Sequence, residues 1–163
     1  MKTLITFLLL LIGSLNGLSQ DRNNNQTNEI TEIDFATFCS LSHFEGVDNA
    51  LEYIGKKGFK LKDVYNKLGC PNIGTSIVNY LILNADVYNF IRFRMEIIEQ
   101  LGEEAYLEFI NLKSPFTSVD NMCPLTGVNF LLEHNPSNNR LQKIKSLLVE
   151  YGAVEDCENL KRN

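Results

Sequence analysis

The stretch IKSLLVEYGA, residues 144–153, decides the fold because the same run of apolar residues before a closing glycine occurs twice earlier in the chain. Displacing the sequence by 50 residues places VNYLIL (residues 78–83) on VNFLLE (residues 128–133), and a displacement of 44 aligns an earlier copy. The apolar residues recur at intervals of three and four, which is the period of an amphipathic helix. Three glycines close the copies: Gly58, Gly102 and Gly152. The sequence therefore predicts three helices that each end on a glycine, the residue best suited to the left-handed backbone after a helix.

The first 20 residues are typical of a secretory signal peptide. Lys2 provides a positive start, LITFLLLLI (residues 4–12) an apolar core, and residues 13–20 a small and polar exit. This apolar segment is shorter than the about 20 apolar residues that a membrane-spanning helix needs, which favours a signal peptide that is cleaved. The alternative interpretation is an uncleaved signal anchor. We therefore expect a secreted protein of the bacterial periplasm, with no stable membrane anchor after cleavage.

The exported part, residues 21–163, is acidic. It holds 14 Lys and Arg against 20 Asp and Glu, a net charge of −6, because Lys2 is the one charged residue of the signal segment. This sign argues against nucleic acid or an anionic membrane as a partner, since both require a basic surface. We divide this part into a flexible polar leader (residues 21–32), a helical domain (residues 33–157) and a charged C-terminal tail (residues 158–163).

Helical periodicity continues through the domain and predicts an all-α fold. The segment from residue 33 to Gly58 has helical spacing on both sides of Gly46, which indicates two helices joined by a turn. Residues 77–101 have the same organisation. Residues 103–113 add an amphipathic piece that is either a short inserted helix or an extended connection.

The third unit carries the most specific motif. CPLT (residues 123–126) stands where ankyrin repeats carry Thr-Pro-Leu-His, and it places Pro124 at the first helical position, where its missing N–H costs nothing. Residues 34–156 therefore resemble an ankyrin-repeat domain of three degenerate units. The resemblance implies a short α-solenoid, a stack of helix-turn-helix repeats in which each pair buries its apolar face against a neighbour.

The units depart from the family pattern in their length. They recur at 44 and 50 residues, whereas ankyrin repeats recur at about 33, and the second unit lacks the Pro-Leu pair. Insertions in repeat proteins map to loops, so we expect long inter-repeat loops at residues 84–93, 102–118 and 133–140. The alternative is an irregular α-helical domain.

The resemblance also implies a disulfide pairing. All four cysteines lie in the exported part, where an oxidising compartment favours their pairing. Cys39 and Cys70 are 31 residues apart, and Cys123 and Cys157 are 34 apart. Each separation is close to one ankyrin period, which would place the partners on adjacent layers of the stack. We therefore expect these two disulfides, with free buried thiols as the alternative.

Two groups of polar side chains are candidates for partner binding. A basic cluster surrounds the first glycine turn and would suit an acidic partner, although a solvated loop has the same composition. A polar loop precedes the last helix. The candidate residues are Lys56, Lys57, Lys60 and Lys62 in the basic cluster, and His134, Asn135, Asn138 and Asn139 in the polar loop.

The sequence contains no strong catalytic or metal motif. No local protease signature surrounds a cysteine that could use His43 or His134 as a base, and C-x-x-C zinc spacing is absent. We therefore expect no cofactor, no metal and no enzymatic activity. The sequence predicts an exported protein–protein interaction module of the ankyrin-repeat type. The alternatives are a periplasmic immunity or inhibitor protein with a compact, disulfide-bonded helical fold, and an enzyme on a helical scaffold.

Overall fold

The computed structural model describes residues 29–159 of the chain. The predicted signal peptide (residues 1–20), residues 21–28 of the predicted leader and residues 160–163 of the predicted tail lie outside the described residues. The described chain is mostly helical with a few short strands, which agrees with the predicted all-α class.

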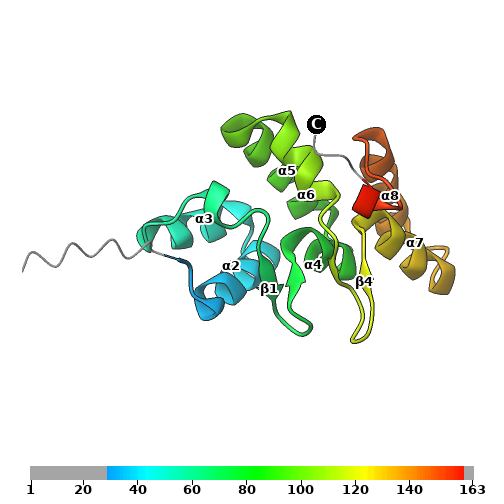
Figure 1. Ribbon diagram of the computed structural model, residues 1–163, viewed down its shortest axis with the longest axis horizontal. Helices are drawn as coiled ribbons and strands as arrows, with labels where there is room; N and C mark the ends of the chain where they lie inside the picture. The colour runs from blue at the N-terminus through cyan, green and yellow to red at the C-terminus, as the bar shows by residue number, and fades with distance from the viewer. Residues whose placement is uncertain (1–28, 160–163) are drawn as a thin grey trace, which may run out of the picture.

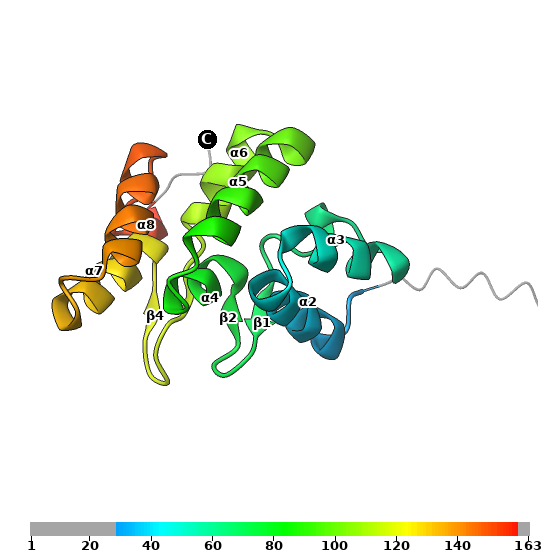
Figure 2. The ribbon, with the colours of Figure 1, turned by 180° about the vertical axis from the view of Figure 1, so that it is seen from behind.

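Three helix pairs lie side by side in chain order (Figure 1, and from behind in Figure 2). Their bounds are α2 Glu32–Phe44 with α3 Val47–Lys56, α4 Ile77–Leu83 with α5 Val87–Leu101, and α7 Pro124–His134 with α8 Asn139–Glu150. The displacement of 50 residues therefore matched equivalent elements, because α4 and α7 are each the first helix of a pair. Two short 3-10 helices, Leu61–Asp63 and Cys157–Asn159, follow the first and third pairs.

Polar side chains fix where several helices begin. The hydroxyl of Thr31 accepts a hydrogen bond of 3.1 Å from a backbone N–H in the first turn of α2. Ser76 caps α4 and Asp86 caps α5 in the same way. Ile30, just before the first cap, is buried, so the folded chain begins before the predicted domain boundary at residue 33.

The predicted glycine turns and proline start are confirmed. Gly58, Gly102 and Gly152 follow α3, α5 and α8 with φ angles of 86°, 93° and 88°. This left-handed region strains any residue with a side chain, which explains why the same residue type closes each copy. Helix α7 begins at Pro124, as the sequence predicted.

Two short antiparallel hairpins, which the sequence analysis did not predict, precede the second and third helix pairs. Strand β1 (Leu68–Cys70) pairs with β2 (Thr75–Ser76), and β3 (Ser114–Pro115) pairs with β4 (Asn121–Met122). Strands of two or three residues are too short to show the alternation by which a sequence reveals a strand. Figure 1 shows both hairpins projecting from the same side of the helices.

The expected long loops are largely absent. Helix α5 already begins at Val87, so residues 84–93 are not a loop, and only residues 135–138 separate α7 from α8. In residues 102–118 the inserted-helix interpretation is correct, because α6 (Glu103–Ile110) packs along α5. Most of the extra length therefore extends or adds helices, whose backbone groups are hydrogen-bonded internally, whereas a long loop would need other partners.

Two side chains of helix α6 contact residues outside the second helix pair, one next to the first pair and one next to the third. The hydroxyl of Tyr65, which lies between the first and second pairs, donates a hydrogen bond of 2.7 Å to Glu108. The ring centroid of Tyr106 lies 5.8 Å from that of Tyr151, which follows α8. The inserted helix thus connects the three pairs on the side from which the hairpins do not project (Figure 1).

A row of buried phenylalanines joins the helices across the core. The ring of Phe38 on α2 lies 5.9 Å from the ring of Phe93 on α5, and Phe93 lies 6.0 Å from Phe109 on α6. All three side chains are fully buried. The apolar faces of the first and second pairs and of α6 therefore share one core, which stabilises them together.

The predicted disulfide pairing is confirmed. Cys39 on α2 is joined to Cys70 on β1 with a Cα–Cα distance of 5.5 Å, and Cys123 is joined to Cys157 at 5.9 Å. No free cysteine remains, so the free-thiol alternative is excluded. The first disulfide joins α2, the first helix of its pair, to the chain after α3. The second joins Cys123, the residue just before α7, to the chain after α8. Two such disulfides fit an oxidising compartment such as the periplasm or the extracellular space.

Candidate protein-binding surface

The tips of the two hairpins, residues 71–74 and 116–120, form neighbouring projections below the helices in Figure 1. In the first tip Asn72 and Gly74 have positive φ angles of 83° and 69°, which close the chain in a tight turn. In the second tip Val119 is 85 % exposed. The exposed residues of the tips are Asn72 and Gly74 in the first hairpin and Ser118, Val119 and Asp120 in the second.

A buried serine holds the two hairpins together. The Oγ atom of Ser114 on β3 lies 2.8 Å from the hydroxyl of Ser76 and 3.1 Å from the hydroxyl of Thr75, both on β2. It also accepts a hydrogen bond of 2.8 Å from the amide of Asn79. All four side chains are buried, and their hydrogen bonds link β2 to β3, although the side-chain oxygen of Asn79 has no partner among the described residues. The spacing between the two tips is therefore fixed by the protein itself.

Asn79 extends this network to the second strand of the second hairpin. Its amide also donates a hydrogen bond of 3.2 Å to the carbonyl of Met122 on β4. The internal match of the sequence aligns Asn79 with Asn129, and Asn129 donates a hydrogen bond of 2.8 Å to Glu155. In both copies the asparagine thus bonds to the chain that comes after its own helix pair.

A groove of about 410 Å³ follows the outer side of α2. Ile33 and Phe44 stand at its two ends with exposed fractions of 78 % and 77 %, and the small residues Ala36 and Ser40 line it between them. Pro71 in the first hairpin closes one side. We call this feature the α2 groove.

One histidine and one carboxylate connect the first two pairs beside this groove. His43 Nδ1 lies 2.7 Å from a carboxylate oxygen of Asp86, whose two oxygens also accept hydrogen bonds from the backbone and side chain of Asn89. The ring of His43 packs against Phe44, with centroids 4.6 Å apart. The contacts orient the imidazole and link α2 to the start of α5, so this histidine has a structural role between the first two helix pairs.

Two of the four lysines of the basic cluster form ion pairs within the molecule. Lys56 pairs with Glu52 at 2.6 Å and Lys57 pairs with Asp34 at 3.2 Å. The Lys57 partner also lowers the pKa of the Asp34 carboxyl, after the larger effects of hydrogen bonds from Tyr53 and Thr31. Lys60 and Lys62 are exposed beside them.

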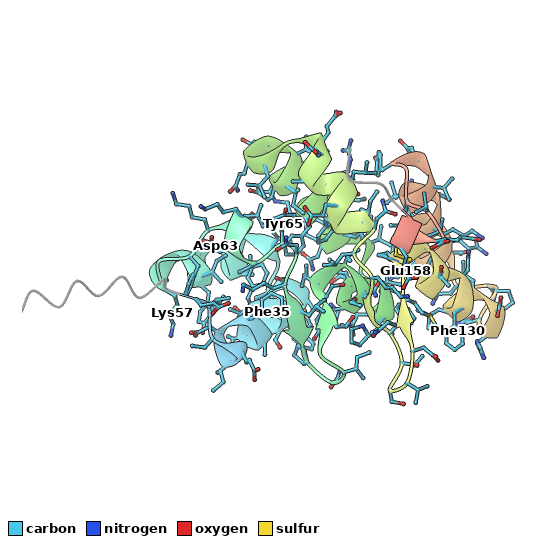
Figure 3. The ribbon with its side chains drawn as sticks, in the orientation of Figure 1. Phe35, Lys57, Asp63, Tyr65, Phe130 and Glu158 are labelled. Atoms are coloured by element: carbon cyan, nitrogen blue, oxygen red, sulfur yellow. A yellow bond between two sulfur atoms is a disulfide. The ribbon has the colours of Figure 1, made fainter. Side chains whose placement is uncertain are left out.

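The polar-loop candidates lie at the opposite end of the molecule. Figure 3 shows Lys57 near one end and Phe130 near the other, and His134 donates a hydrogen bond of 2.9 Å to the Phe130 carbonyl. Asn138 caps α8, while Asn135 and Asn139 are exposed. The structure therefore does not bring the two predicted groups of binding residues together into one site.

Sequence reasoning missed the α2 groove and the paired hairpins. The apolar spacing in residues 33–44 was visible, but the same pattern describes a helix face that is covered and one that is open. The serine network had no signal, because Ser76 and Ser114 are 38 residues apart and serine is common in loops.

Comparison of the chain with protein-family models, with curated proteins and with solved structures gave no match. In the part of the chain that the structure describes, no group of three or more His, Cys, Asp or Glu side chains is placed to hold a metal ion. No helix between residues 29 and 159 has both the length and the apolar character needed to span a bilayer.

Proposed function

We propose that this protein is an exported, non-enzymatic module of the ankyrin-repeat type that binds another protein through its hairpin side. The single observation that carries the proposal is the pair of projecting hairpins held at a fixed spacing by the buried contacts of Ser114. A rigid, preorganised surface loses little conformational entropy on binding, which favours recognition of a folded partner.

The arrangement of the helices supports the repeat assignment. Each of the three pairs is followed by a glycine in the left-handed region, and a hairpin precedes the second and third pairs. Helix pairs of this kind bury their apolar faces against neighbours. The two hairpin tips project from the helices and are left free for a partner. The two disulfides support export to an oxidising compartment, with the bacterial periplasm as the proposed location.

The test is a capture experiment with matched variants. The oxidised exported protein is immobilised and exposed to the exported fraction of the source cells, beside a Val119→Asp variant at the hairpin tip. A Val149→Asp variant is the control, because Val149 is 57 % exposed on α8, away from the hairpins. Circular dichroism and disulfide mapping verify that each variant is folded.

We expect a protein that the wild type and Val149→Asp retain and that Val119→Asp loses. Recovery of the same proteins by all three baits would contradict binding through the hairpin side. Recovery of one toxin or hydrolase, inhibited at very high affinity, would instead assign the protein as an immunity or inhibitor protein.

A further inference from the structure

The outer face of α2 is apolar although no other part of the described chain covers it. The opposite face of this helix carries Phe35, Phe38 and Cys39 into the core. The outer face carries Ile33 and Phe44, both more than three-quarters exposed. The first helix of a row of stacked pairs normally needs a polar outer face for solubility. An apolar face in this position therefore indicates that something else packs there.

The shape of the α2 groove suits a helix. Helix α2 has 13 residues, which corresponds to a length of about 20 Å. Large exposed side chains stand at both ends. Between them lie the small residues Ala36, Thr37 and Ser40 and the half-buried Leu41, which packs against the core, so the face is hollow in the middle. Small residues allow the close approach of another helix, whose own apolar side chains would fill the hollow at positions i, i+3, i+4 and i+7.

The charges around the groove specify the partner further. Glu45 lines the groove at the Phe44 end. Glu32 is the first residue of α2, next to Ile33, and is exposed beside the groove without lining it. Among the described residues neither carboxylate has a hydrogen bond or ion pair from its side chain, whereas nearby Asp34 and Asp48 are paired with Lys57 and Arg92. Glu32 begins α2 and Glu45 directly follows its last residue, so the two positions are about 20 Å apart along the helix axis.

We propose that the α2 groove is the docking site for an amphipathic helix of a partner protein, with an apolar face and a Lys or Arg residue near each end. The inference rests on the proposed protein-binding function and adds a second contact surface to it. Desolvated apolar contacts in the hollow provide the affinity, and the two terminal charge pairs fix the position of the helix and favour its approach.

The test uses two synthetic helices with the same fluorescent label. Both carry the same leucine face and the same uncharged polar face, but one has lysines in its first and last turns and the other has glutamates there. Binding to the oxidised exported protein is measured by fluorescence anisotropy at two salt concentrations. We expect saturable binding of the lysine peptide, at least tenfold weaker binding of the glutamate peptide, and a smaller difference at high salt.

A charge reversal on the protein makes the test specific to the groove. The E32K/E45K variant should bind the lysine peptide at least tenfold more weakly than the wild type does, and it should bind the glutamate peptide more tightly. The control is E99K/E133K, which changes the net charge equally at exposed positions of α5 and α7 and should leave both affinities near those of the wild type. Equal binding of the two peptides, no saturable binding, or the same response from both double variants overturns the groove assignment.

The two proposals fail separately. If E32K/E45K loses the lysine peptide but still captures the partner that Val119→Asp loses, the groove is a second, independent surface. If the peptides do not bind while capture through the hairpin tip persists, the groove assignment is wrong and the proposed function stands. If capture at the hairpin tip fails while the peptides bind as expected, the groove assignment stands and binding through the hairpins is wrong.

Discussion

The side-chain oxygen of Asn111 accepts a hydrogen bond of 2.8 Å from the backbone N–H of Val154, although the two residues are 43 positions apart. The amide nitrogen of Asn111 donates to the carbonyls of Leu107 and Gly152 at 3.0 and 3.4 Å. One buried side chain therefore fastens the turn after α8 to the end of α6.

Replacing this side chain should loosen the turn. In Asn111→Ala the Val154 N–H loses its partner in a partly buried place, and a buried polar group without a partner costs about 1–3 kcal/mol. We expect the free energy of unfolding in urea to fall by this amount. The control Asn139→Ala changes an exposed residue of α8 and should stay within about 0.5 kcal/mol of the wild type. Equal effects in the two variants would contradict the role of Asn111.

The second prediction concerns the buried contacts of Ser114 between the two hairpins. Ser114→Ala removes the hydroxyl that meets Ser76, Thr75 and Asn79, and leaves their buried polar groups short of a partner. We expect a loss of about 1–3 kcal/mol in unfolding free energy and faster amide exchange in both hairpins. Ser118→Ala, at the exposed tip of the same hairpin, is the control. Unchanged exchange in the first hairpin would mean that Ser114 does not couple the two.

Gly127 gives a prediction that depends on shape. A methyl group added there would come within 2.4 Å of the ring of Phe116, which is buried. Gly127→Ala should therefore destabilise the fold by about 1–3 kcal/mol, because the ring must move. Gly55→Ala lies in helix α3 with nothing near the new methyl, and it should stabilise by about 0.5–1 kcal/mol. Opposite signs for two identical substitutions are readily measured by denaturation, and equal signs would contradict this packing.

The two disulfides should differ in their resistance to reduction. Cys39 and Cys70 are fully buried, whereas Cys157 is partly exposed in the 3-10 helix at the end of the described chain. Under increasing dithiothreitol, followed by alkylation and mass spectrometry, we expect Cys123 and Cys157 to be labelled first. The Cys123→Ser/Cys157→Ser variant should lose about 2–4 kcal/mol of stability. Earlier labelling of Cys39 would show that burial does not control the order.

Tyr65 predicts a loss of stability at alkaline pH. Burial, followed by the hydrogen bond to the Glu108 carboxylate, raises the pKa of this hydroxyl from 10.0 to about 12. The folded state therefore holds the proton more tightly than the unfolded chain. The stabilisation is complete below pH 10 and is lost between pH 10 and pH 12. In Tyr65→Phe the free energy of unfolding should fall less steeply between pH 10 and pH 12 than in the wild type. Unfolding curves at several pH values measure this dependence, and the same dependence in both proteins would contradict the contact.

Local signals in the sequence predicted much of the fold. Gly58, Gly102 and Gly152 mark helix ends because the left-handed backbone there excludes most other residues. Pro124 marks a helix start because its missing N–H is tolerated at that position. The cysteine pairing followed from separations of 31 and 34 residues, each close to the ankyrin period that the resemblance implies. Each of these predictions depends on backbone chemistry or on regular separation along the chain.

Features that depend on contacts between residues far apart in the chain could not be predicted from the sequence. Lys57 is neutralised by Asp34, 23 positions earlier, and Ser114 meets Ser76 only because two hairpins lie together. The apolar residues at both ends of α2 were consistent with a core position. Whether such a face is covered depends on the presence of a neighbouring helix pair, which local periodicity does not report.

Helix α6 should make the unfolding of the protein more cooperative. In a simple row of helix pairs each pair contacts only its neighbours, so an end can unravel while the rest persists. Here Glu108 binds Tyr65 and Asn111 binds Val154, so the inserted helix holds the first connection and the last turn at once. Losing either end breaks contacts with the centre and weakens the other end. The three pairs are therefore expected to unfold in one cooperative transition, so that the protein has the all-or-none behaviour of a globular domain although it is built from three helix pairs.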